Sequence, residues 1–213
     1  MSGIELAGTD IGSPALAGST VAVAGGYEIV AGGRDIWGES DEFHFAQEPV
    51  IGDFDLQIRL VSLDMAHDYS KAGIMARESL DPGSRHVFFL AFPDNRPRNQ
   101  NNGGLEFQYR GRPDWMSSAI YPSDCKTEPP AFAVTFPDTR LRLTRVGDRF
   151  RAFLWISKGE WKLYCAMTLR MRPTLHVGLA VTSHNPERSV RAGFRDPALL
   201  PTVADDAKGG SIW

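Results

Sequence analysis

The sequence has few cysteines and no long hydrophobic run. Only two of the 213 residues are cysteine, Cys125 and Cys165, and their spacing does not resemble that of metal ligands. Either they pair as one disulfide or both remain buried thiols, and the sequence leaves these alternatives open. No stretch approaches the roughly 18 apolar residues that a membrane span requires. We therefore expect no membrane partner.

The chain also lacks a cluster of charge of one sign. Its 23 Lys and Arg and 26 Asp and Glu are mixed along the chain and give a formal net charge of −3. Nucleic-acid-binding proteins typically gather Lys and Arg to contact phosphates, so we expect no nucleic-acid partner. No basic segment followed by an apolar run marks a signal peptide. The chain as it stands is expected in the cytoplasm, or outside the cell if it is an excised module.

Motifs of catalysis are missing as well. There is no HExxH, no Cys-x-x-Cys, no phosphate-binding glycine loop and no Gly-x-Ser-x-Gly. Glycosidases need two carboxyl groups about 5 to 9.5 Å apart across the sugar bond. Asp53 and Asp55 share a strand face without a third acid in step, and Glu78 and Glu106 would have to converge from different strands. We therefore predict no catalytic residue and no cofactor.

Glycine and proline, in contrast, are frequent and divide the chain into short segments, as in an all-β protein. Residues 54–60 (FDLQIRL) and 105–110 (LEFQYR) alternate apolar and polar side chains, which is typical of half-buried antiparallel strands. Residues 140–156 predict a hairpin that turns at Gly147-Asp148, where glycine permits a positive φ. Residues 66–80 have helical propensity, but Gly73 and the flanking strands favour a strand. We predict a single domain over residues 1–200, followed by a C-terminal tail over 201–213.

The segment DIWGESDEFHF (35–45) combines acids, aromatics and a histidine. We interpret it as the start of a strand and not as an active site. Phe43 and Phe45 are expected in the core, with Trp37 packed at the start of the strand. Asp41 and His44 are then expected on the wetter side, together with Glu42, because neighbouring residues of a strand point to opposite faces. On this interpretation, replacing His44 changes stability little.

Seven sequence blocks resemble one protein superfamily. They are DIGSPALAGS (10–19), GGRDIWGESDEFHF (32–45), GDFDLQIRL (52–60), KAGIMARESL (71–80), LEFQYR (105–110), LRLTRVGDRF (141–150) and VGLAVTSHN (177–185). Their order is similar to that of the concanavalin A-like lectin and glucanase superfamily, in particular the group named after the regulation of enolase protein. The resemblance implies an all-β fold: a two-sheet antiparallel jelly-roll β-sandwich.

The resemblance also implies that saccharides bind on one sheet face. Polar residues of the expected strands alternate in step, and the loop after residue 110 supplies two aromatic rings on which a sugar can stack. We expect a saccharide or another small polar ligand on this face, although a solvated outer face is an equally good interpretation. The expected binding residues are Gln57, Arg59, Arg77, Glu106, Gln108, Arg110, Trp115, Tyr121 and Arg142.

Related sandwiches hold a structural Ca²⁺, which makes a calcium site a second expectation from the resemblance. Asp10 and Asp196, near the two ends of the domain, are the positions that we name for it. Calcium takes six to eight oxygen ligands, and two carboxylates supply only part of such a set.

Three functions remain open at this point. The first is a carbohydrate-binding, lectin-like module without catalytic activity. The second is a saccharide-active enzyme, either a glycoside hydrolase or a lyase, on the same scaffold. The third is an intracellular domain for protein interaction or regulation. The fold by itself does not decide among them, and the combination of aromatic residues with unpaired acids favours the first.

Overall fold

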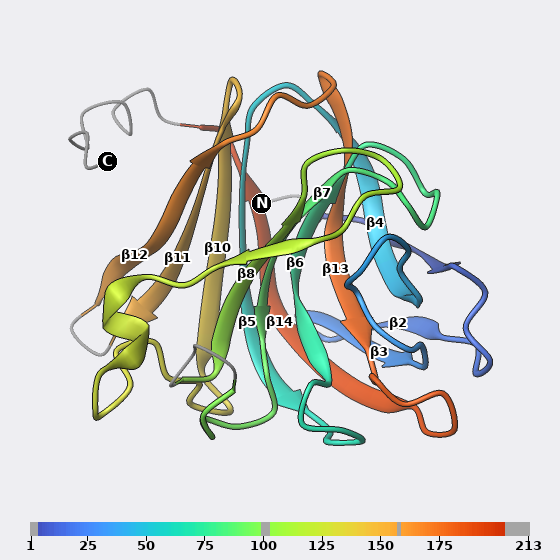
Figure 1. The fold of residues 1–213 in the computed structure, drawn as a ribbon, viewed down its shortest axis with the longest axis horizontal. Coiled ribbons are helices and arrows are strands. Elements are labelled where there is room, and N and C mark those ends of the chain that lie inside the picture. The colour runs from blue at the N-terminus through green and yellow to red at the C-terminus, as the bar shows by residue number, and fades with distance from the viewer. Residues whose placement is uncertain (1–3, 99–102, 157–158, 203–213) are drawn as a thin grey trace.

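The structure is a computed structural model that describes residues 4–98, 103–156 and 159–202. Over these residues it consists of two antiparallel sheets of seven strands each, which pack face to face (Figure 1). Sheet A has the order β1 (Ala7–Ile11), β4 (Phe43–Ile51), β13 (Thr174–Thr182), β6 (Lys71–Arg77), β7 (His86–Ala91), β8 (Leu105–Arg110) and β9 (Ser118–Ile120). Sheet B has the order β12 (Glu160–Thr168), β11 (Arg149–Ile156), β10 (Thr139–Val146), β5 (Phe54–Leu63), β14 (Val190–Leu200), β3 (Gly26–Ala31) and β2 (Ser19–Val23). A short 3-10 helix, η1 (Ser123–Lys126), follows β9.

The predicted strands and the hairpin turn at Gly147-Asp148 are confirmed. Val146 pairs with Arg149 around the predicted hairpin turn, and Gly147 has a φ of 59°. The ambiguous segment forms β6 and not a helix, because it lies between β13 and β7 in the middle of sheet A. Of the predicted C-terminal tail, residues 203–213 lie outside the described residues.

The main core lies between the two sheets. Phe54, Leu56, Ile58 and Leu60 of β5 are its clearest example, since each is at most 2% exposed and the alternate positions face away. Burying an aliphatic or aromatic side chain of this size contributes about 1.5–3 kcal/mol. The period-two pattern of the sequence therefore orients this strand.

Sheet A has a second buried cluster on its outer face, the face turned away from sheet B. The members of this outer core are Ile11, Ile36, Phe43, Phe45, Met75, Phe88, Leu90, Phe92 and Ala180. Strands β6 and β7 are accordingly buried on both faces, and they lack polar alternation for that reason. Residues 32–42 help to cover the outer core: Ile36 packs into it, and the Asp41 amide donates to the Pro82 carbonyl at 3.0 Å.

The segment 35–45 is oriented differently from the prediction. Phe43 and Phe45 are fully buried as expected, but they belong to the outer core. Asp41 and His44 are also buried, at 0% and 4% exposure, so their predicted place on the wetter side is wrong. Asp41 is enclosed because residues 32–42 fold back over the outer face of sheet A.

His44 is enclosed because it points toward β2 of sheet B. Its Nδ1 lies 2.7 Å from Asp10 Oδ1 and its Nε2 lies 2.9 Å from Thr20 Oγ1. A glycine makes room for the ring: a Cβ on Gly18 would lie 2.3 Å from its Nδ1. The imidazole is therefore a polar link between the edges of the two sheets.

The two cysteines do not form a disulfide. Cys125 and Cys165 are both free and buried, and burial raises the pKa of each thiol.

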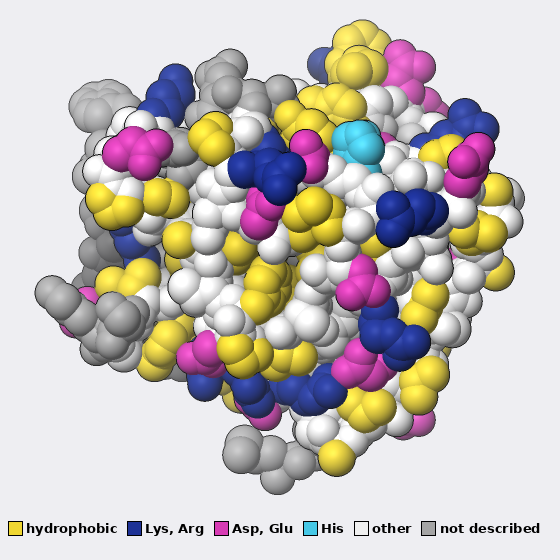
Figure 2. All heavy atoms as spheres, turned by 90° about the horizontal axis from the view of Figure 1, so that it is seen from below, with side chains coloured by type: hydrophobic (Ala, Val, Ile, Leu, Met, Phe, Trp, Pro, Cys, Tyr) yellow, Lys and Arg dark blue, Asp and Glu magenta, His cyan; other side chains and the backbone are white. Residues whose placement is uncertain are grey.

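No helix in the described ranges is long and apolar enough to cross a membrane. On the face seen from below, basic and acidic side chains alternate with hydrophobic ones, without a large field of one sign among the coloured residues (Figure 2).

Candidate functional site

The structure divides the predicted polar face between opposite sides of the molecule. Leu56 of β5 and Phe107 of β8 both point into the main core, from sheet B and sheet A respectively. Their alternate neighbours therefore point in opposite directions. Gln57, Arg59 and Arg142 lie on the outer face of sheet B; Glu106, Gln108 and Arg110 lie on the outer face of sheet A. The expectation of one continuous ligand face is wrong, because periodicity does not tell in which sheet a strand lies.

On sheet B the polar side chains satisfy one another. Arg142 donates from Nε and Nη2 to both oxygens of Asp55, at 2.9 and 2.7 Å. Gln57 donates to the same carboxylate at 3.3 Å. Arg59 pairs with Asp196 at 2.8 Å. This outer face is a ladder of ion pairs, and a cavity lined by Gln57 and Arg59 measures about 60 Å³.

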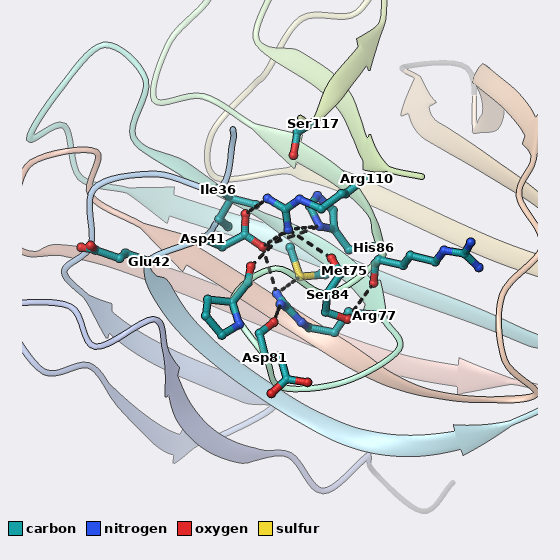
Figure 3. A network of polar contacts seen from close by, with 12 residues as sticks. Ile36, Asp41, Glu42, Met75, Arg77, Asp81, Ser84, His86, Arg110 and Ser117 are labelled. Carbon is teal, nitrogen blue, oxygen red and sulfur yellow. Dashed lines mark hydrogen bonds and ion pairs between the residues drawn. The ribbon is translucent and has the colours of Figure 1, made fainter. Parts of the chain in front are cut away.

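On sheet A, two of the predicted ligand-binding arginines are fully buried in an ion-pair network (Figure 3). Arg110 donates two hydrogen bonds to Asp41, from Nη2 to Oδ1 at 2.6 Å and from Nη1 to Oδ2 at 2.8 Å. Arg77 Nη1 lies 3.4 Å from Asp41 Oδ2. The ring of His86 lies against the same carboxylate, with Nδ1 at 3.6 Å from Oδ2.

The remaining donors of the network bind the backbone of the covering loops. Arg110 Nε donates to the Trp115 carbonyl at 2.9 Å, and Arg77 Nε donates to the Ser79 carbonyl at 2.7 Å. Burial lowers the pKa of His86 to about 3, so this ring is neutral at pH 7. Burial also lowers the pKa of Arg77 to about 10, against the opposing effect of Asp41, and the guanidinium stays charged. The predicted role of Arg77 and Arg110 at a ligand is corrected accordingly: their donors hold loops onto the sheet.

Next to this network, the outer face of sheet A opens into a pocket of about 290 Å³. Strands β6 and β8 supply its floor, and loops supply its walls. Its lining residues are Asp35, Trp37, Tyr69, Lys71, Glu106, Gln108, Tyr121 and His184. We call it the sheet A pocket.

One side of the sheet A pocket is a charged pair. Lys71 Nζ lies 2.6 Å from Asp35 Oδ1, and the lysine side chain is 3% exposed. His184 Nδ1 lies 3.2 Å from the other oxygen of Asp35. Burial raises the pKa of Asp35, but Lys71 and His184 outweigh burial and hold this pKa at about 2. The carboxylate is therefore ionised at neutral pH.

The opposite side is a carboxylate held by neutral groups. Gln108 Nε2 donates to Glu106 Oε1, and the Tyr121 hydroxyl donates to Glu106 Oε2 at 2.9 Å. Glu106 is 3% exposed and Gln108 is 1% exposed, so both form the floor and not the rim. The polar floor is rigid because each Glu106 oxygen has its own donor.

Aromatic rings form the rest of the pocket. The His184 and His67 ring centroids lie 4.3 Å apart, and Tyr69 lies 5.6 Å from His184. Trp37 lies beside Lys71, with Nζ 5.8 Å from the ring centroid. Trp115, which we expected here, is 60% exposed and lines a separate hollow with Arg112.

Of the nine predicted binding residues, the sheet A pocket therefore brings together only Glu106, Gln108 and Tyr121. Sequence reasoning did not assign the other five lining residues. Two signals were available: a lysine that begins the apolar β6, and the Asp35-Ile36-Trp37 run that was interpreted as strand packing. The remaining residues, Tyr69 and His184, meet only because two loops lie side by side.

A catalytic pair and a calcium site would each require two acidic residues to lie close together, and in both cases the residues lie apart. Glu78 accepts from the Arg172 amide at 2.9 Å and lines a different hollow from Glu106, so these two carboxyls do not converge. Asp10 accepts from the amide of Gly18, just before β2, at 3.1 Å. Asp196 accepts from Arg59, and its amide donates to Gly25, just after β2. Asp10 and Asp196 thus lie at opposite ends of β2 and do not form one calcium site.

No protein-family model matches the chain, and no curated protein matches it. Solved structures do. A protein of unknown function from Saccharomyces cerevisiae is similar with a TM-score of 0.62 and 19% identity, over 92% of this chain and 97% of that one. The carbohydrate binding module CBM66 from Bacillus subtilis is similar with a TM-score of 0.54 and 16% identity, over 91% and 95%.

A third similar structure is a mutant of the GH43 protein BlXynB from Bacillus licheniformis, with a TM-score of 0.56 and 10% identity. The likeness covers 81% of this chain but only 32% of that protein. Likeness at such identities shows the fold alone, and membership of the regulation-of-enolase group stays a prediction. The chain is a concanavalin A-like jelly-roll β-sandwich.

Proposed function

We propose that this protein is a non-catalytic carbohydrate-binding module and that a sugar binds in the sheet A pocket. One observation carries the proposal: the pocket combines aromatic rings with planar hydrogen-bonding side chains. Trp37, Tyr69 and Tyr121 offer rings, while Asp35, Glu106 and Gln108 are arranged around the same space. Sugars are recognised in this way, because their hydroxyls need oriented partners and their C–H faces stack on rings.

The size and rigidity of the site also support a sugar. A space of about 290 Å³ is at the lower end of ligand pockets and suits a single small ring. Lys71 is fixed by Asp35 and by the Ile36 carbonyl at 3.3 Å, and Glu106 is fixed by its two donors. Pre-ordered polar groups reduce the entropy that a weakly bound ligand must overcome. One of the similar structures is, by its name, a carbohydrate binding module, and the likeness covers 95% of it.

The ionised state of Asp35 excludes this residue as a catalytic acid. Cleavage of a glycosidic bond requires one carboxylic acid that protonates the leaving oxygen and a second group that acts as base or nucleophile. With a pKa of about 2, Asp35 has no proton to give at neutral pH. The pocket therefore lacks the matched pair of one protonated and one ionised carboxyl unless Glu106 supplies the acid.

A saccharide-active enzyme is the second candidate, since Asp35 and Glu106 line one pocket. In that reading Asp35 is the base or nucleophile and Glu106 the acid. A panel of polysaccharides assayed for new reducing ends and unsaturated products separates the candidates. Turnover that disappears in Glu106→Gln with the fold intact would establish the enzyme.

The test of binding is a glycan array with the full chain, followed by titration of each bound glycan. Trp37→Ala is expected to weaken binding about tenfold, because a stacking ring contributes about 1 kcal/mol or more. Trp115→Ala is the matched control, as it removes an exposed tryptophan outside the pocket. If Trp115→Ala lost binding and Trp37→Ala kept it, the sugar would lie in the other hollow.

A further inference from the structure

The orientation of the Gln108 amide is fixed by its neighbour. Its Nε2 donates to Glu106 Oε1, and a carboxylate only accepts hydrogen bonds. Turning the amide by 180° would place two oxygens against each other, so the side-chain oxygen of Gln108 must point away from Glu106. Gln108 is 1% exposed, and the apolar outer core lies beside it.

This Oε1 is an acceptor without a donor. Within the part of the chain that the structure describes, no group donates to it, and it is shielded from bulk solvent. A buried acceptor left unsatisfied destabilises the folded state, so proteins rarely keep one without a use. Gln108 lines the sheet A pocket, so a molecule in the pocket that displaces the side chain slightly is the available source of a donor.

The charge on this side of the pocket is not balanced. Asp35 is paired with Lys71, but the hydrogen-bond partners of Glu106 among the described residues, Gln108 and Tyr121, are both neutral. A ligand group placed here meets one full negative charge and one bare acceptor. A carboxylate in the same place would be repelled and would leave the Gln108 oxygen unsatisfied.

From these two observations, and resting on the proposed function, we infer the class of sugar. The geometry points to a neutral or amino sugar that donates a hydrogen bond, from a hydroxyl or an ammonium group, to Oε1 of Gln108. The pocket accordingly selects against sugars that carry a carboxylate. An amino sugar has the advantage of a cation beside Glu106, since charge-assisted hydrogen bonds are the stronger ones.

The probes are two matched sets of monosaccharides: methyl glucoside, glucosamine and methyl glucuronide, and the three galactose counterparts. The full chain is titrated with each, and backbone amide shifts of β6 and β8 are followed by NMR. We expect the amino sugar to bind most tightly, and the uronate about tenfold or more weaker than the neutral sugar.

Three variants separate the contributions. Gln108→Met keeps the approximate shape and removes both the acceptor and the donor to Glu106, and it is expected to weaken the neutral and amino sugars about tenfold. Glu106→Gln removes the charge, and it is expected to reduce the preference for neutral sugar over uronate about tenfold. Gln57→Met is the control, because Gln57 has the same donor role toward Asp55 on the opposite face. It is expected to bind like the unmodified chain.

The outcomes distinguish this inference from the proposed function. Wild-type chain that binds sugars, with unchanged affinity in Gln108→Met, would overturn the inference and leave the binding module standing; the acceptor would then serve water alone. Uronates that bind as tightly as neutral sugars would overturn the charge selection. A chain whose β6 and β8 amides respond to no probe, and which retains no glycan, would overturn the proposed function itself. Thermal unfolding of each variant verifies the fold.

Discussion

The chain contains the same local pattern twice, on opposite sides of the molecule. Asp55 and Gln57 on β5 and Glu106 and Gln108 on β8 are each an acid followed two residues later by a glutamine, and in each pair the glutamine donates to the acid. One pair lies on the outer face of sheet B and the other on the outer face of sheet A. They differ in what lies beside them.

The neighbouring strand determines this difference. Next to Gln57, β10 places Arg142, which donates two hydrogen bonds to Asp55 and completes a largely buried ion pair. Next to Gln108, β7 places Phe88, which offers no polar group. The acid of β8 therefore finds its second donor in the loop residue Tyr121, and a pocket remains between strand and loop. The same local pattern thus gives a closed ion pair on one face and a polar pocket floor on the other.

Stability should show the same contrast between the two faces. Asp41→Ala leaves Arg77 and Arg110 buried without their shared carboxylate, and we expect it to lower the free energy of unfolding by about 3–5 kcal/mol. Arg59→Ala breaks the exposed pair with Asp196 and should cost about 0–1 kcal/mol. Urea unfolding of both variants measures this. Equal losses would remove the distinction between a buried and an exposed ion pair.

The edge where the two sheets meet gives the next largest effect. His44→Ala removes the imidazole that Asp10 and Thr20 share, and we expect a loss of about 1–3 kcal/mol in the same measurement. The sequence by itself predicted almost no effect for this change. A loss below about 0.5 kcal/mol is usual for surface substitutions and would support the exposed position of His44 that the sequence predicted.

The pH dependence of stability sharpens the comparison further. Burial holds the pKa of His86 at about 3, below its ordinary value of 6.5. Between these two pH values the unfolded chain binds a proton on His86 and the folded chain does not. Stability is then fully present above pH 6.5 and falls as the pH is lowered toward 3. Between pH 7.5 and 5, this residue should account for a loss of about 2 kcal/mol.

His86→Gln should reduce that loss, because glutamine does not titrate. His86 lies on β7, so this effect belongs to sheet A. Unfolding curves at pH 5, 6 and 7.5 for both chains test this. If His86→Gln left the pH dependence of the free energy of unfolding unchanged, another titrating group would be its cause.

Much of the fold was readable from the sequence. The alternation in β5 and the glycine at residue 147 are local features, and they report strand faces and a hairpin directly. The apolar run of β7 indicates a strand that is buried on both faces. We expected strands that bury one face, so this signal was not used. The sequence blocks 71–80 and 177–185 led to the correct fold, a two-sheet antiparallel jelly-roll β-sandwich.

The candidate site was only partly readable. Glu106, Gln108 and Tyr121 lie close together in the chain, and their proximity followed from one strand and its loop. Asp41 and Arg110, which are 69 residues apart, could not be paired from the sequence.

The sequence by itself determined which side chains share a strand face, because that depends on a backbone repeat of two residues. Only the tertiary structure decided in which of the two sheets each strand lies and what covers its outer face. Those choices depend on contacts between segments far apart in the chain, and the same choices buried Arg110 and placed Gln108 at the floor of a pocket.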